Sequence, residues 1–291
     1  MPSLKSLRLR INSVKSTQKI TSAMKMVAAA KLRRAQSQAE ASRPYAKRMG
    51  QMMSAIAAGA ATNPNAPPLL VGTGRDKTHL LVAVTADRGL AGAFNSNISR
   101  AVRNKVRELE AQGKTVKVFA VGRKGNDYFR REIAGQIVGT KNFVGKKTIE
   151  FADAEAISES IVAMFREGQF DVCTLVFNRF ISVMTQTVTE SPLIPAATPV
   201  ANDNAAAVDY EIEPDDGTLL DRLLPRNLAV QIYSALLENS AGFYASQMTA
   251  MDNATRNAGE MIKKLSLNYN RARQANITSE LIEIISGAEA V

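Results

Sequence analysis

Few residues of the kinds that do covalent or metal chemistry occur in this chain. Its 291 residues include one histidine, His79, and one cysteine, Cys173. A Ser-His-Asp set needs a histidine with partners, and the sequence offers His79 no evident ones. Cys173 stands among apolar neighbours, which is typical of a buried structural thiol. We interpret both residues as structural, and because no cluster of His, Cys or carboxylates has metal-ligand spacing, we expect no metal site.

Two glycine-containing loops could in principle cradle a phosphate. Gly72-Thr73-Gly74 lacks the Gly-Lys-Ser/Thr ending of a phosphate loop, and no strand precedes it. The segment DRGLAGAFN, residues 87–95, lies between a predicted strand and a predicted helix, where open α/β sheets usually bind ligands. It has neither the G-x-G-x-x-G pattern nor a phosphate-binding lysine. We therefore expect no catalytic residue and no cofactor, and any chemistry would belong to another chain.

Composition limits the class of protein. With 45% hydrophobic and 22% charged residues the chain is globular, and no uninterrupted apolar run approaches the ~18 residues of a membrane span. The N-terminus is basic and has no apolar core of a signal peptide. A single cysteine rules out an intramolecular disulfide bond and suits a reducing compartment. We expect a soluble, intracellular protein.

The excess positive charge lies at one end of the chain. Residues 1–60 hold twelve Lys or Arg and one acid, Glu40, whereas the whole chain carries +10. Such a segment can be a solvated helix face, or it can bind nucleic acid, an anionic membrane or an acidic protein. The absence of aromatic residues before Tyr45 disfavours nucleic acid, and the Ala-rich apolar stripe without Trp or Phe disfavours a membrane surface. An acidic protein partner is favoured.

Residues 1–60 are predicted to form one long helix. No Gly or Pro occurs between Pro2 and Pro44, and strong helix formers fill most positions. The helix should end near Gly59, and about 55 residues at ~1.5 Å each would span roughly 80 Å. Its apolar seam is interrupted by Gln18, Thr21 and Lys25 before it resumes at Ala28. A helix of this length needs a long partner.

The middle of the chain alternates strands and helices. Residues 61–76 should be a linker, 77–207 an α/β domain, and 208–224 a connection with a short strand at 208–213. Alternation of this kind predicts a mainly parallel, Rossmann-like sheet covered by helices. The predicted strands are THLLVAVTA, TVKVFAVG, FDVCTLVFNRFIS and TQTVTESPLI. The predicted helices are ISRAVRNKVRELEAQ, capped by Asn95, Ser96 or Asn97, a helix around Asn126 to Glu132, and ADAEAISESIVAMFREG.

Residues 225–291 are predicted to form the long partner helix. Pro225 can occupy its first turn, and an apolar seam with three-four spacing runs from Leu237 to Ala272. Two long helices at opposite ends of one chain can pair as an antiparallel coiled coil. The expected fold is therefore α/β, with this coiled coil added to the Rossmann-like domain.

Three segments of the sequence resemble the gamma subunit of F-type, proton-translocating ATP synthases. They are ITSAMKMVAAAKLRRAQ near the N-terminus, DRGLAGAFNSNI after the first predicted strand, and AMDNATRNAGEMIKKLSLNYNRARQANITSELIEIISGA at the C-terminus. Their order and spacing fit the family from end to end. The resemblance implies a non-catalytic central-stalk rotor that couples proton flow through the membrane c-ring to ATP synthesis or hydrolysis at the beta subunits.

The same resemblance implies partners and a location. The partners are the hexamer of alpha and beta subunits, the epsilon subunit and the c-ring, with one copy of this chain per complex. Nucleic acid is not among them, and the membrane is reached only through the c-ring. The initial Met-Pro and the missing transit peptide favour a peripheral protein on the cytoplasmic side of a bacterial inner membrane, with the matrix side of the mitochondrial inner membrane as the alternative.

The resemblance also implies site residues. The family's contacts with the beta subunits fall on Met24, Lys25, Gln247, Gln274, Thr278 and Glu280, and its contacts with the c-ring on Tyr210 and Glu213. Two positions depart from the family's usual pattern. Gln247 stands where Arg is common, and Phe243 stands where Glu is common. These departures put one usual charge pair with a beta subunit in doubt.

Overall fold

A computed structural model describes residues 3–60, 67–196 and 216–289. The chain divides into two compact units. We call residues 1–29 and 247–291 the helical unit, and residues 30–246 the sheet unit. Helix α1 (Leu4–Ala60) and helix α6 (Asp216–Glu289) each contribute residues to both units. The predicted long helices at the two ends of the chain are thus present.

In the helical unit, α1 and α6 pair antiparallel. Arg8 donates a hydrogen bond to the hydroxyl of Tyr269 at 2.7 Å, and further along α1 Lys25 pairs with Asp252 at 2.6 Å. Residue numbers therefore increase along α1 while those of the facing residues on α6 decrease. The seam matches the predicted spacing. Its buried side chains are Leu7, Thr21 and Ala28 on α1, and Met251, Ala258 and Leu265 on α6.

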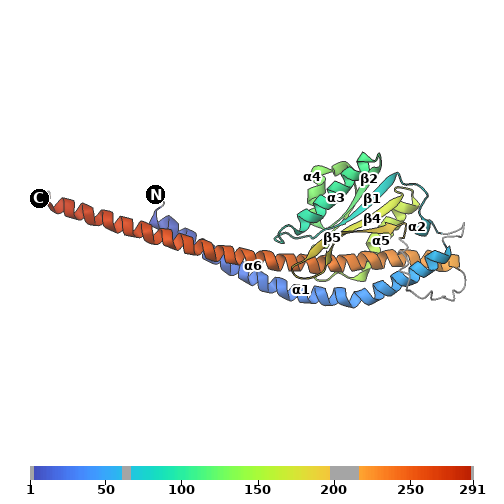
Figure 1. The fold of residues 1–291 in the computed structure, drawn as a ribbon, viewed down its shortest axis with the longest axis horizontal. Helices are drawn as coiled ribbons and strands as arrows, with labels where there is room; N and C mark the ends of the chain where they lie inside the picture. Colours follow the sequence, from blue (N-terminus) through green and yellow to red (C-terminus); the bar gives the residue numbers. More distant parts are fainter. Residues whose placement is uncertain (1–2, 61–66, 197–215, 290–291) are drawn as a thin grey trace. The chain divides into compact units, whose positions relative to one another are not determined.

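The last part of α6 has no partner helix among the described residues. Every described side chain from Arg273 to Ser286 is exposed, whereas the seam before Ala272 is buried or half-buried. Figure 1 shows this end of α6 running past the start of α1. Its apolar side chains are 50% exposed or more, and they are Ile277, Leu281, Ile282, Ile284 and Ile285.

The sheet unit contains a five-stranded sheet with the order β3-β2-β1-β4-β5. All neighbouring strands are parallel except β4 and β5, which form an antiparallel pair. The predicted fold class, a mainly parallel α/β sheet with long terminal helices, is confirmed. The strands are β1 (Thr78–Val84), β2 (Thr115–Val121), β3 (Ile137–Lys141), β4 (Val172–Phe180) and β5 (Gln186–Ile194).

Helices cover both faces of this sheet (Figure 1). Helices α3 (Phe94–Ala111) and α4 (Arg123–Glu132) pack on the face that carries Leu81 and Ala83 of β1. The short α2 (Pro68–Val71), helix α5 (Phe151–Arg166) and the first part of α6 pack on the face that carries Leu80 and Val82. Successive residues of β1 therefore alternate between two apolar cores, as a parallel strand buried on both faces requires.

Several boundaries differ from those expected. Strand β3 was not predicted, because its alternating residues are half-exposed or exposed and Gly139 interrupts it. Helix α3 begins at Phe94 after Ala93, so the prediction of a cap at Asn95, Ser96 or Asn97 is wrong. The side chain of Asn95 instead accepts a hydrogen bond from Ala86 N at 2.9 Å and donates one to Arg88 O at 3.1 Å.

The start of the last helix also needs correction. Helix α6 begins at Asp216 and contains Pro225 in its interior, so neither a helix start at 225 nor a connection up to 224 holds. An interior proline costs roughly 3 kcal/mol. Leu224 and Leu228 beside it are completely buried in the core under the sheet, and this packing offsets the cost. The predicted short strand at 208–213 lies outside the described residues.

Candidate functional site

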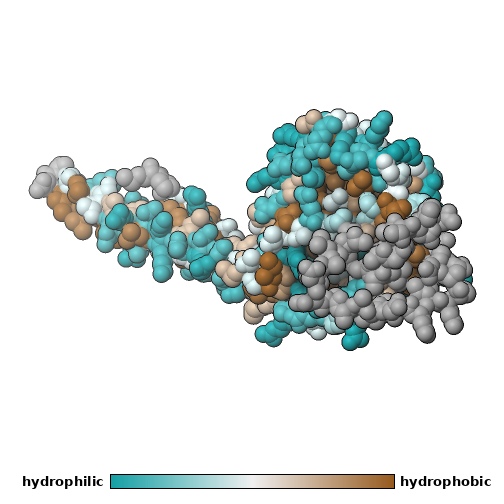
Figure 2. Space-filling view, turned by 45° about the vertical axis from the view of Figure 1, so that its right-hand side comes forward, coloured by the Kyte–Doolittle hydropathy of each residue, from teal (hydrophilic) through white to brown (hydrophobic). Residues whose placement is uncertain are grey.

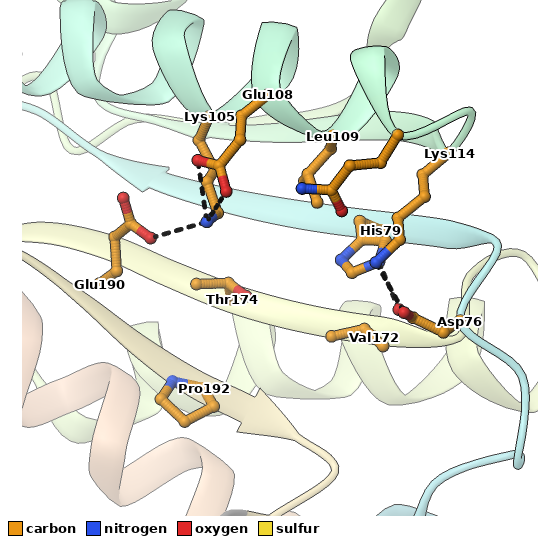
Figure 3. A pocket seen from close by; sticks show the side chains of 11 residues that line it. Asp76, His79, Lys105, Glu108, Leu109, Lys114, Val172, Thr174, Glu190 and Pro192 are labelled. Carbon is orange, nitrogen blue, oxygen red and sulfur yellow. Dashed lines mark hydrogen bonds and ion pairs between the residues drawn. The ribbon is translucent and has the colours of Figure 1, made fainter.

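The only histidine of the sequence belongs to a surface network on the sheet. His79 Nε2 lies 2.6 Å from Asp76 Oδ1, and Lys114 Nζ lies 2.6 Å from Asp76 Oδ2 (Figure 3). The hydrogen bond from Lys114 is the largest of the effects that hold the pKa of Asp76 below its usual range. Sequence reading gave His79 no partner, although Asp76 stands only three residues before it. This network offers no nucleophile.

This network lines part of a shallow pocket of about 450 Å³, and the other charged side chains of the pocket also pair with one another. Lys105 Nζ lies 3.1 Å from Glu108 Oε1 and 3.6 Å from Glu190 Oε2, so it links α3 to β5 (Figure 3). Burial opposes the charged form of Lys105, but these two carboxylates outweigh it and raise the pKa of the lysine. The charged residues that line this pocket therefore hold α3 and β5 together.

Cys173 and the acidic side chains provide no metal or thiol chemistry in the described residues. Cys173 is completely buried in β4, and burial raises the pKa of its thiol, which keeps it protonated and unreactive. No group of three or more His, Cys, Asp or Glu among the described residues could hold a metal ion.

The two glycine-containing loops use their polar groups to hold the fold. In the loop after β1, the carboxylate of Asp87 accepts hydrogen bonds from Arg123 N and Phe143 N, both at 2.9 Å. In the loop before β1, Thr73 donates a hydrogen bond to Asp171 at 3.0 Å. The first loop is thus tied to the start of α4 and to the segment after β3, the second to the residue before β4, and neither forms a catalytic set.

The helical unit has a polar section in the middle of its seam. The hydroxyl groups of Thr21 and Thr255 lie 2.8 Å apart, and one turn away Lys25 pairs with Asp252, which also lies 3.7 Å from Arg256. The hydrogen bond from Lys25 lowers the pKa of Asp252. The side chains of Lys25 and Asp252 remain 45% and 39% exposed, so solvent screens this pair and its contribution is small. The two helices are thus held by weak polar contacts here.

The structure places the expected contact residues in separate parts of the helical unit. Met24 and Lys25 are half-buried on α1 beside the polar section, and Gln247 is half-buried on α6. Gln274, Thr278 and Glu280 are exposed on the unpartnered end of α6, where the Thr278 hydroxyl donates only to Gln274 O within its own helix. The structure does not bring these two groups together. Tyr210 and Glu213 lie outside the described residues.

One buried charge pair in the sheet unit was missed by sequence reading. Glu238 on α6 is 7% exposed and accepts hydrogen bonds from Arg43 Nε at 2.8 Å and Phe180 N at 3.0 Å. Arg43 also donates to Phe180 O at 3.3 Å. The pair joins α1, α6 and the end of β4. A glutamate directly after Leu236 and Leu237 was the available signal.

Phe243, which stands where the family commonly has a glutamate, is buried in the sheet unit. It is 6% exposed, and its ring meets that of Phe94 edge-on, with centroids 5.8 Å apart. The position therefore packs α6 against the start of α3.

None of the described helices has a stretch long and apolar enough to span a membrane. Both long helices carry polar contacts: Lys25 on α1 bonds to Asp252 on α6, and Arg43 on α1 bonds to Glu238 on α6.

The sequence is similar to known proteins over its whole length. A family model described as ATP synthase matches residues 3–291. The chain is 72% identical to the ATP synthase gamma chain of Acidiphilium cryptum and 61% identical to that of Granulibacter bethesdensis, and each comparison covers 100% of both chains.

The fold is similar to solved structures of rotor assemblies. A chain from the mitochondrial ATP synthase central stalk and c-ring of Tetrahymena thermophila is 27% identical, with a TM-score of 0.62, over 81% of this chain and 99% of that one. A chain from the rotor of the Euglena gracilis mitochondrial ATP synthase is 18% identical and shares the fold, with a TM-score of 0.65, over 94% of this chain and 98% of that one. With matches over its whole length, the chain belongs to the gamma chains of ATP synthase.

Proposed function

We propose that the chain is the turning central stalk of a proton-translocating ATP synthase. Proton flow through a membrane c-ring would turn it, and its helices would drive the catalytic beta subunits through conformations that differ in nucleotide affinity. The chain itself would contribute no group to ATP chemistry. Its family membership supports this role, together with a pair of long helices drawn from opposite ends of one chain.

The polar section of the helical unit suits a surface that must move past its neighbours. Exposed ion pairs contribute only ~0 to 1 kcal/mol, so Lys25 can exchange Asp252 for an acidic group of a beta subunit at little cost. Torque would then come mainly from steric contact. Met24, Gln247, Gln274, Thr278 and Glu280 are the other residues that we assign to contacts with beta subunits.

The remaining partners follow from the same proposal. The alpha and beta subunits would surround the paired helices, and the epsilon subunit and c-ring would bind the rest of the chain, with Tyr210 and Glu213 facing the c-ring. One copy would serve each complex. The chain would be a peripheral protein on the cytoplasmic side of a bacterial inner membrane, bound through the c-ring. Its identity of 72% to the gamma chain of Acidiphilium cryptum and of 61% to that of Granulibacter bethesdensis supports this location.

A charge added beside Lys25 tests the proposal. Met24→Lys places a second cation next to the Lys25–Asp252 pair and should disturb the contact of this position with an acidic group of a beta subunit. We expect assembly to persist while the ratio of proton pumping to ATP hydrolysis falls at least twofold in inverted membrane vesicles.

Met26→Lys is the matched control. Met26 is 65% exposed on the same helix, about 200° around the axis from Met24, so it adds the same charge on another face. Its pumping-to-hydrolysis ratio should stay near that of the unmodified complex. An unchanged ratio in Met24→Lys, or an equal loss in both variants, would contradict the assigned contact.

A further inference from the structure

A basic cavity lies in the sheet unit at the carboxyl ends of the parallel strands. Its volume is about 530 Å³, within the usual range for small-ligand sites. The loops that follow β1, β2 and β3 line it, together with residues of α1 and α6. Open α/β sheets bind their ligands at this edge. Its charged lining consists of one acid, Asp87, and six bases: Lys31, Arg34, Arg88, Arg123, Lys146 and Lys147.

The acid and two of the bases are already engaged. Both oxygens of Asp87 accept backbone hydrogen bonds, and its carboxylate forms no ion pair with a cation of the lining among the described residues. Lys146 pairs with Asp153, which lies outside the cavity lining. Burial opposes ionisation of Asp153, but the hydrogen bonds from Lys146 and the Glu150 backbone hold its pKa below the usual range. Arg123 lies 3.9 Å from Asp127.

Four cations of the lining remain without an ion pair in the part of the chain that the structure describes. They come from three segments: Lys31 and Arg34 from α1, Arg88 from the loop after β1, and Lys147 from the loop after β3. Bringing like charges together costs energy unless an anion offsets it. The four side chains are exposed to solvent along the cavity lining, and this concentration of unmatched charge points to an anionic ligand.

Before any ligand binds, one of these cations is oriented by a side-chain contact, and the backbone that carries another is fixed. The ammonium group of Lys31 lies 5.6 Å from the centre of the Tyr244 ring, a cation–π contact that directs it toward α6. The loop that carries Arg88 is fixed by Asn95, which bonds both Ala86 N and Arg88 O. A site whose donors are already positioned loses less entropy on binding.

We propose that this cavity binds a small phosphate-class anion, either an inorganic phosphate or pyrophosphate or the phosphate chain of a nucleotide. Lys31 and Arg34 would contact it from α1, and Arg88 and Lys147 from the loops. The cavity volume fits such a ligand, whereas an acidic helix of another protein is about 10 Å wide and needs an open groove. The bound anion would join α1 to the loops of the sheet and would regulate how firmly they are held together. No phosphate would be transferred there.

Equilibrium dialysis of the full-length chain against radiolabelled pyrophosphate tests this site and is insensitive to self-association. We expect saturable binding near one anion per chain, weakening as ionic strength rises. In the double variant Lys31→Ala, Arg88→Ala the dissociation constant should rise at least tenfold, because the two residues approach the anion from different segments. Absence of saturable binding at millimolar pyrophosphate would overturn the proposal.

Arg107→Ala and Arg100→Ala together form the control. Both arginines are exposed on α3, outside the cavity lining, so this variant removes the same charge. Its pyrophosphate affinity should equal that of the unmodified chain, and an equal loss would mean that net charge alone attracts the anion. Unlabelled ATP should displace the label and adenosine should not; displacement by adenosine would overturn the phosphate class. The concentrations of inorganic phosphate and of ATP that displace half of the label are then compared. Stronger displacement by phosphate indicates a free anion, and stronger displacement by ATP indicates a nucleotide.

Discussion

Glu238 is the buried carboxylate on which α1, α6 and β4 converge. Removing it would leave Arg43 Nε and the Phe180 N–H without their acceptor, while Arg43 would keep only its bond to Phe180 O. Losing charge-assisted hydrogen bonds at a buried site costs roughly 2–3 kcal/mol. We therefore expect Glu238→Ala to lower the free energy of unfolding by about this amount in urea denaturation.

The exposed pair in the helical unit gives the comparison. Lys25→Ala removes a cation whose side chain is 45% exposed, so its loss should stay below about 1 kcal/mol. Equal losses in the two variants would mean that burial does not set the strength of these contacts.

Asp171 should make stability depend on acid pH. It accepts hydrogen bonds from Lys77 N, Thr78 N and Thr73 Oγ1. Burial opposes its ionisation, but these bonds outweigh burial and hold the pKa of Asp171 below its usual range. Because the folded pKa is depressed, this stabilisation is complete above the unfolded value of about 3.9 and is lost as pH falls through the folded pKa.

Asp171→Asn tests this sign. The variant should lose roughly 1–3 kcal/mol at pH 7 and show a shallower fall in unfolding free energy between pH 5 and 3 than the unmodified chain. Asp127→Asn alters a half-exposed carboxylate with a long ion pair and should change stability at pH 7 by less than about 0.5 kcal/mol. A steeper fall in Asp171→Asn would show that the pKa shift has the opposite direction.

Single residues were predictable from sequence only where their own type decided the outcome. Cys173 was expected to be buried and is buried, because a thiol among apolar neighbours has no other favourable place. The partners Asp252 of Lys25 and Glu238 of Arg43 were not foreseen. Each pair joins residues far apart in sequence, so it depends on the register between two helices that no local pattern specifies.

At the scale of elements, one glycine in α6 limits helix stability. A Cβ on Gly259 would lie 3.2 Å from Gln18 Nε2, the far end of a flexible side chain that can move aside. Replacing a helical glycine by alanine gains up to about 1 kcal/mol. We therefore expect Gly259→Ala to raise the free energy of unfolding by roughly 0.5–1 kcal/mol. Unfolding in urea, followed by the ellipticity at 222 nm, measures this change.

Gly242→Ala is the paired variant in the same helix. Its Cβ would lie 3.2 Å from the ring of Phe94, which is 3% exposed and packed against Phe243. This ring cannot move freely, so strain should cancel most of the gain. If both variants gain equally, the space around the glycine does not decide the outcome.

Elements were predicted well where the pattern was long and strong. The terminal helices and strands β1, β2, β4 and β5 follow from sustained periodicity and apolar runs. Strand β3 escaped because its residues are largely exposed and it pairs only at the edge of the sheet. The start of α6 was misplaced because burial of Leu224 and Leu228 outweighs the local preference of Pro225.

At the scale of the whole molecule, the end of α6 should govern association of the purified chain. Ile277, Leu281, Ile284 and Ile285 recur at helical spacing and form an exposed apolar stripe, and Figure 2 shows hydrophobic surface at this end of α6. Without other subunits to cover it, we expect the full-length chain to self-associate at micromolar concentration in sedimentation velocity experiments.

Polar substitutions test the role of the stripe. Leu281→Gln with Ile284→Gln should shift the chain to a monomer, because the two changes interrupt the apolar stripe and glutamine is a good helix former. Ile181→Gln with Met184→Gln changes two residues that are 62% and 81% exposed at the β4–β5 turn. This second variant should associate like the unmodified chain, and a monomer in both cases would place the association elsewhere.

The bare end of α6 also has a mechanical consequence. A lone α-helix is torsionally more compliant than two helices joined across a seam, since only its own backbone hydrogen bonds resist winding. Twist applied to the chain would accumulate beyond Ala272, where α1 no longer braces it. When twisted, that end would store elastic strain but transmit little torque. We therefore expect the torque to be carried where α1 and α6 run together.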